Sequence, residues 1–312
     1  MNILLPKAIT AASFGPATSI PALDAARGEV AWVASGLYKV GDERVDADGI
    51  YSCVKEHTAT GTSKPPSQDA VNWLFKQPTN RMCPFDSYLF TKARALHSLT
   101  YELRGVFVDG LALYGLEGDG LDISVTAGAG GPNLIDPISI DLWQQAFGEW
   151  EYLFGDLARG THYTLKVLPI HPDARIKITV RRNNADVEAA VGYISIGNHK
   201  TLLAPVGGLG ATEYGAEVAT KDYGYTEDHA DGTYRDVEGR KAKNINLTCV
   251  IDAAMAPAVD SLLTQIAGKA VAIEVSNLPK YSHLATVGKV TGTVRSTDWR
   301  TSRVDIQIKG NV

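Results

Sequence analysis

The stretch WLFKQPTNRMCPFD, residues 73–86, sets a polar turn between large apolar side chains. Trp73, Phe75 and Phe85 flank residues 78–81, in which Pro presets a turn conformation and Asn tolerates the tight backbone that follows. Burying such rings removes large apolar areas from water, at roughly 25 cal/mol per Å². The sequence therefore predicts that this stretch pins two layers of structure together, with a small module before it and a larger body after it.

Length and composition indicate a globular protein of several domains. A chain of 312 residues favours two or three domains, and 45% hydrophobic with 21% charged residues is ordinary for a folded chain. The net charge of -5 gives no basic field for nucleic acid, so no nucleic-acid partner is expected. No run approaches the ~20 apolar residues of a membrane span, and the first residues lack the pattern of a signal peptide. We therefore expect no membrane span.

The first 80 residues predict an arm and a small β module. Residues 1–30 are rich in Ala, Ser, Thr, Pro and Gly, which is typical of an extended N-terminal arm. Residues 31–80 contain short strand patterns with Gly and Asp turns, and Asp48-Gly49 is a good hairpin turn.

Residues 81–197 predict a β-sandwich, most simply a jelly-roll-like one. Short alternating segments recur at regular spacing and are punctuated by glycine-rich turns. We expect strands at 99–105, 110–116, 121–126, 150–154, 164–168, 174–180 and 192–197.

Residues 198–312 predict a small α+β domain with one helix on a sheet. Residues 226–239 form a polar, charged hairpin pattern. Apolar residues at Val259, Leu262, Leu263 and Ile266 have helical spacing, and Gly268 ends the pattern. Alternating strands are expected at 242–250, 271–275, 287–294 and 303–308. The predicted fold class is therefore mainly β with this one helix.

The residues with reactive side chains form no catalytic or metal-binding pattern. Cys53, Cys83 and Cys249 are scattered and lack zinc-ligand spacing, so buried free thiols are expected. Glu149 and Glu151 are the best pair for glycoside hydrolysis, because residues two apart on a strand share a face. They fit exposed charges beside a buried Trp150 at least as well. The acidic residues of the 226–239 hairpin fit a solvated face better than a calcium site. The sequence predicts no catalytic residues, no metal and no cofactor.

The order of aromatics in the first module resembles the small chitin- and cellulose-binding modules of the type 5/12 kind. The resemblance covers roughly residues 30–75 and runs through Tyr38-x-x-Gly-Asp-x-x-Val and Gly-x-Tyr. These modules stack sugar rings on exposed aromatics, so it implies carbohydrate-binding candidates at Trp32, Tyr38, Tyr51 and Trp73. In so small a module some of these rings must instead form the core.

Several segments in order resemble a family of tailed-bacteriophage tail or tail-tip virion structural proteins, some described as carbohydrate-binding. Residues 73–86 resemble its W-x-x-x-x-P-T-N-R-W-x-x-F-D signature, with Met82 in place of the second tryptophan. Residues 209–218 match L-G-x-T-x-Y-G-x-x-V, and Gly224 replaces the serine that follows Asp222-Tyr223. Trp150-Glu151-Tyr152-Leu153-Phe154 resembles the family's W-x-x-Y-x-F but has one residue fewer between Trp and Tyr, and residues 6–10 fit P-x-x-I-T.

This resemblance implies a virion structural protein of the tail tip or baseplate, without catalysis. It implies contacts with other phage tail proteins, a homo-oligomer such as a ring or trimer, and assembly in host cytoplasm into the virion. A dedicated carbohydrate-binding receptor for host surface polysaccharide is the alternative, and a glycan hydrolase is a third reading.

Overall fold

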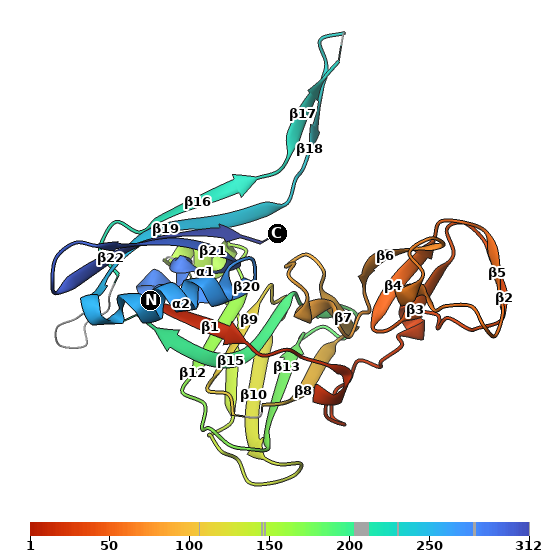
Figure 1. Cartoon of the computed structure of the whole chain (residues 1–312), viewed down its shortest axis with the longest axis horizontal. Coiled ribbons are helices and arrows are strands. Elements are labelled where there is room, and N and C mark those ends of the chain that lie inside the picture. Colours follow the sequence, from red (N-terminus) through yellow and green to blue (C-terminus); the bar gives the residue numbers. More distant parts are fainter. Residues whose placement is uncertain are drawn as a thin grey trace. The chain divides into compact units, whose positions relative to one another are not determined.

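The computed structural model describes residues 1–105, 107–144, 146, 148–202, 212–229, 231–276 and 279–311. The chain is mainly β, as expected, with antiparallel strand ladders and a helix near its C-terminal end (Figure 1). Its contacts divide it into two compact units. Unit 1 comprises Met1–Lys7, Asp109–Leu111 and Ser195–Val312, and unit 2 comprises Ala8–Val108 and Ala112–Ile194. The residues of the expected small module belong to unit 2, those of the expected sandwich belong to unit 2 except 109–111 and 195–197, and those of the expected α+β domain belong to unit 1.

Unit 1 is built on an antiparallel sheet with the order β15-β1-β20-β21-β22-β19-β16. A hairpin, β17–β18, joins β16 to β19. The strands are β1 Asn2–Pro6, β15 Tyr193–Thr201, β16 Glu217–Asp222, β17 Tyr225–Asp228, β18 Tyr234–Val237, β19 Lys241–Asp252, β20 Ala270–Glu274, β21 Ala285–Ser296 and β22 Thr301–Gly310. The strands expected in the last third of the sequence are therefore present, while residues 203–211, which include the start of the second phage-like motif, lie outside the described residues.

The N-terminal residues form a strand inside the unit 1 sheet, where an arm was expected. Strand β1 pairs with β15 on one side, Asn2 opposite Thr201, and with β20 on the other, Ile3 opposite Ile273. Ile3 and Leu4 are buried. An interior place in the sheet pairs the backbone of residues 2–4 on both edges and that of residues 5–6 on one edge, where an exposed arm would leave these polar groups to water.

Helix α2, Ala256–Ile266, confirms the helix expected from the spacing of apolar residues. Val259, Leu263 and Ile266 are buried in one apolar cluster with the strands of the sheet. The chain leaves the helix through Gly268 at φ +76°, a backbone conformation that glycine adopts without strain. The helix therefore lies on the sheet by its apolar face, as the α+β pattern predicts.

Unit 2 contains a sandwich-like set of sheets and a small module of its own. Its main sheet has the order β11-β10-β13-β8, β14 pairs with β7, and the module has the sheets β3-β4-β6 and β2-β5. The strands are β2 Gly36–Tyr38, β3 Glu43–Asp46, β4 Gly49–Cys53, β5 His57–Ala59, β6 Trp73–Pro78, β7 Ala93–Leu96, β8 Ser98–Arg104, β9 Gly110–Tyr114, β10 Gly120–Ala127, β11 Ile138–Asp141, β12 His162–Lys166, β13 Ala174–Arg181 and β14 Glu188–Val191. Short 3-10 helices in the two units are Ala11–Ser13, Ala25–Arg27, Pro66–Gln68, Cys83–Phe85, Ala253–Met255 and Pro279–Leu284.

The stretch 73–86 links the apolar cluster of the small module to the main sheet of unit 2. Trp73 is buried in the module, where its ring meets that of Tyr38 edge-on at 5.1 Å. At the other end Phe85 packs edge-on against Tyr101 of the main sheet at 5.7 Å. Phe75, expected to be a third buried anchor, is instead 53% exposed, and its ring meets that of Tyr51 edge-on at 5.6 Å.

The turn between these anchors is held by the side chain of Asn80. Its Nδ2 donates to Asp24 Oδ2 at 2.7 Å and to the Arg94 carbonyl at 2.9 Å, and its Oδ1 accepts from the Arg94 N–H at 2.9 Å. Its backbone N–H donates to Glu29 Oε1 at 2.7 Å. Asn80 is buried, so these bonds are shielded from competing water. One residue thus ties the turn to the segment 24–29 and to β7.

Residues 149–154 form a helix and not the expected strand. Helix α1, Glu149–Phe154, begins after Gly148 at φ +92° and ends at Gly155. Its rings of Trp150 and Phe154 lie one turn apart, with centroids at 4.6 Å. A short aromatic run fits both a strand and a helix by period, and here no sheet edge takes it up.

Candidate functional site

The structure places the four predicted sugar-binding aromatics in and around the core of the small module. Tyr38 and Trp73 are both 2% exposed and form its apolar cluster with Cys53 and Ala59, and Trp32 and Tyr51 pack against it half-buried. The Tyr38 hydroxyl donates to the Val33 carbonyl at 2.7 Å. Protein atoms therefore cover the rings of Tyr38 and Trp73, so these two rings form the core of the module. This is one of the two roles that the sequence allowed for them. Stacking of sugar on Trp32 or Tyr51 stays a prediction.

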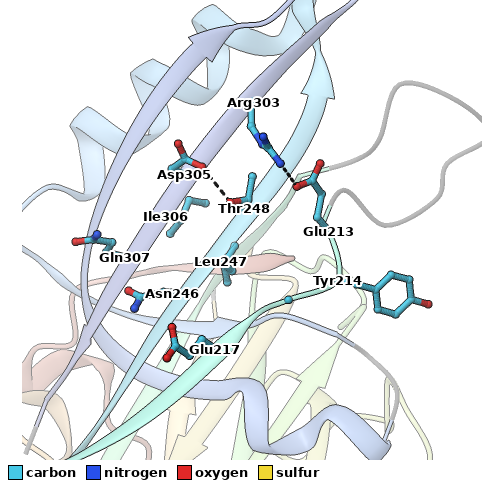
Figure 2. A pocket seen from close by; sticks show the side chains of 11 residues that line it. Glu213, Tyr214, Glu217, Asn246, Leu247, Thr248, Arg303, Asp305, Ile306 and Gln307 are labelled. Atoms are coloured by element: carbon cyan, nitrogen blue, oxygen red, sulfur yellow. Dashed lines mark hydrogen bonds and ion pairs between the residues drawn. The ribbon is translucent and has the colours of Figure 1, made fainter.

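A polar hollow of about 360 Å³ lies on the open face of the unit 1 sheet (Figure 2). Strands β16, β19 and β22 and the segment before β16 line it with Glu213, Tyr214, Gly215, Glu217, Asn246, Leu247, Thr248, Arg303, Asp305, Ile306 and Gln307. Two pairs of its polar side chains interact with each other. Arg303 forms an ion pair with Glu213, and the Thr248 hydroxyl donates to Asp305 at 3.0 Å. Tyr214 is 97% exposed and points away from the hollow in Figure 2. The hollow is thus a polar surface whose Arg303 and Asp305 side chains already have partners within it.

The most conspicuous surface of unit 2 is the exposed aromatic face of α1. Trp150 is 77% exposed, and Tyr152, Leu153 and Phe154 are exposed as well. Trp143, six residues before α1, is exposed as well, and the Arg159 guanidinium lies 4.2 Å from its ring centroid. Soluble proteins rarely leave such a group of large apolar side chains uncovered, so this surface is a candidate interface. The sequence analysis missed it because a strand would have buried Trp150.

A hollow of about 550 Å³ adjoins this aromatic surface. Trp143, Gly155, Asp156, Leu157 and Arg159 line it. Arg159 is fixed from behind, because its Nε donates to Asp119 Oδ1 at 2.8 Å. An aromatic ring with a carboxylate and a fixed guanidinium can contact either a protein side chain or the polar and CH groups of a sugar.

The paired carboxylates considered for hydrolysis do not share a face. Glu149 and Glu151 are the first and third residues of α1, and residues two apart on a helix are turned by roughly 200°. The strand geometry that would have made them a converging pair is absent from this segment. Among the described residues, no three His, Cys, Asp or Glu side chains are placed to hold a metal ion.

The three cysteines are free and buried, as expected. Burial raises the pKa of the Cys83 thiol to about 12 and also raises the pKa values of Cys53 and Cys249. Because the thiolate is the nucleophile, we expect none of the three to react with a disulfide reagent such as DTNB at pH 8 in the native protein, and all three to react in denaturant. A rapid stoichiometric reaction in the native protein would contradict this placement.

Comparisons with known proteins give no family for this chain. No protein-family model matches the sequence, and no match is found among curated proteins. In the part of the chain that the structure describes, no helix has the length and apolar character needed to cross a bilayer.

Proposed function

We propose that this chain is a virion structural protein of the tail tip or baseplate of a tailed bacteriophage. The observation that carries the proposal is the uncovered aromatic face of α1, with Trp150 and Phe154 in mutual contact and exposed to solvent. Other tail proteins would cover this face in the particle, since burying such rings is what stabilises protein interfaces. The ordered resemblance of residues 6–10, 73–86 and 209–218 to tail-tip proteins supports the phage assignment.

The role is structural and without catalysis. The protein assembles in the host cytoplasm with other tail proteins and remains in the virion. Its N-terminal module and loops can also contact host surface polysaccharide during attachment.

Incorporation into particles tests the proposal. The double variant Trp150→Ala/Phe154→Ala is expected to be incorporated about tenfold less than the unsubstituted chain, since truncated interface hot spots cost at least 1.4 kcal/mol. Its melting temperature should not change, because both rings are exposed in the free chain. Mass spectrometry of purified phage complemented with each variant measures this.

Tyr88→Ala, which removes another exposed aromatic ring of unit 2, is the matched control and should be incorporated normally. Equal incorporation of the double variant and the control would count against α1 as the assembly surface. Absence of the unsubstituted chain from purified particles would refute the virion assignment itself.

A dedicated carbohydrate-binding receptor is the second candidate, favoured by the hollow beside Trp143 with Asp156 and Arg159. Titration of host surface polysaccharide against tryptophan fluorescence separates the candidates. Saturable quenching that Trp143→Ala abolishes would favour the receptor. Release of reducing ends would favour a hydrolase, and no binding leaves the assembly role.

A further inference from the structure

The β17–β18 hairpin of unit 1 extends away from the sheet that carries it (Figure 1). It is a two-stranded ladder in which Tyr225 lies opposite Val237 and Asp228 opposite Tyr234. Every side chain of these two strands is exposed except the half-buried Val237. An isolated two-stranded hairpin is marginally stable in water at best, so a partner is needed to hold this one in place.

A close approach of two glycines forms the base of the hairpin. A Cβ added at Gly239 would lie 1.8 Å from Gly224 N, so the two backbones meet where no side chain fits. The Tyr223 N–H donates to the Arg240 carbonyl at 3.0 Å beside them. The direction of the hairpin is thus set by its backbone, while its side chains stay available on both faces.

The hairpin is acidic and carries exposed tyrosines. Residues 225–238 contain five Asp and Glu residues against one Arg, which gives a formal charge of -4. Tyr225 and Tyr234 are exposed beside these charges. Tyrosine and carboxylate side chains together fit a surface that presents arginine and an aromatic ring.

Such a surface exists on the same unit, at the loop end of the β21–β22 ribbon, residues 295–303. This loop end contains three Arg and one Asp, a formal charge of +2. Trp299 is 80% exposed, and the Arg300 guanidinium lies 4.2 Å from its ring centroid. Arg295 and Arg303 lie beside Asp305 and Glu213, so Arg300 with Trp299 is the main docking group.

The two surfaces lie at opposite ends of β19. Asp222, which leads into the hairpin, is opposite Lys241 at the start of β19, and Thr301, at the loop end, is opposite Asp252 at its end. A strand rises about 3.3 Å per residue, so these ends are roughly 35 Å apart. The acidic hairpin is therefore too far from the loop end of its own chain to dock on it.

We propose that the acidic hairpin of one copy docks on the loop end of the β21–β22 ribbon of a second copy. The contact is head-to-tail, because two different surfaces meet: in a pair, one copy keeps its loop end free and the other keeps its hairpin free. Such contacts close into a ring or continue as a stack. This inference rests on the proposed structural role and names a second copy as the partner.

Charge reversal with a mixing experiment tests the contact. The variant Glu227→Lys/Asp228→Lys/Glu238→Lys changes the formal charge of the hairpin from -4 to +2, and Arg295→Glu/Arg300→Glu changes that of the loop end from +2 to -2. Each is expected to raise the dissociation constant of self-association about tenfold or more, measured by sedimentation at low salt. An equimolar mixture of the two variants should associate again, because a basic hairpin then meets an acidic loop end. Glu56→Lys/Asp136→Lys, which reverses two exposed acids of unit 2, is the control and should associate like the unsubstituted chain.

Three results would overturn the inference. They are a strictly monomeric unsubstituted chain, reversal variants that associate normally, and a mixture that does not regain association. Recovery in the mixture excludes misfolding of the variants as the cause of their weakness. If the chain is monomeric yet present in purified particles, this inference fails while the proposed function stands.

Discussion

Replacing Asn80 with alanine is expected to lower the free energy of unfolding of unit 2 by roughly 3 kcal/mol, because buried partners lose their hydrogen bonds. The Asn80 side chain binds Asp24 and both backbone groups of Arg94. Alanine keeps the hydrogen bond from the backbone N–H to Glu29. Asp24 and the two backbone groups of Arg94, however, lose their hydrogen bonds to the Asn80 side chain. Urea denaturation followed by tryptophan fluorescence measures the change.

Gln77→Ala is the matched control, because Gln77 is an exposed amide three residues earlier on β6. Its effect should stay within about 0.5 kcal/mol, as for most surface substitutions. If Asn80→Ala costs no more than Gln77→Ala, the turn is not what joins the segment 24–29 and β7. In that case the account of residues 73–86 as the link of unit 2 would fail.

Replacing Asp119 with alanine is expected to lower the free energy of unfolding by about 3 kcal/mol. This is the lower end of the range for a broken buried ion pair, because its partner Arg159 is partly exposed. Asp119 is buried and accepts bonds from Arg159 Nε and the Asn183 N–H, both at 2.8 Å. Its loss leaves the guanidiniums of Arg159 and Arg182 without their carboxylate. Asp173→Ala removes a carboxylate that pairs with Arg175 but is 54% exposed, so it should cost less than about 1 kcal/mol. Equal costs would contradict the buried network.

The same carboxylate gives a pH dependence with a definite sign. Burial acts to raise the pKa of Asp119, but the Asn183 N–H and the Arg159 guanidinium outweigh it, so the pKa lies below the ordinary 3.8. The stabilisation is therefore complete above pH 3.8 and is lost as the pH falls through the lower, folded-state pKa. The stability gap between the unsubstituted chain and Asp119→Asn should be constant at neutral pH and should shrink in acid. A gap that widens in acid would reverse the assigned sign.

Much of the fold was accessible from local pattern. Local sequence pattern was enough to predict strands with regular alternation, such as β10 and β13. It was also enough to predict helix α2 from the spacing of its apolar residues. The role of residues 73–86 was also accessible in outline, since Trp73 packs in the small module and Phe85 packs against the main sheet.

The features that the sequence could not predict are mostly those that depend on residues far away along the chain. Strand β1 is defined by β15 and β20, about 200 residues or more along the chain, so residues 2–6 resemble an arm when taken alone. The partners of Asn80 are likewise remote, and a turn propensity says nothing about Glu29 or Arg94. The α1 segment is too short for its period to separate helix from strand, which hid the aromatic face on which the proposed function rests.

The most direct test of the assembly role is a cryo-EM reconstruction of the phage particle that encodes this chain. The account predicts density for the chain at the tail tip or baseplate, with Trp150 and Phe154 of α1 buried against a neighbouring protein. A particle that lacks the chain, or one in which α1 remains open to solvent, would contradict it.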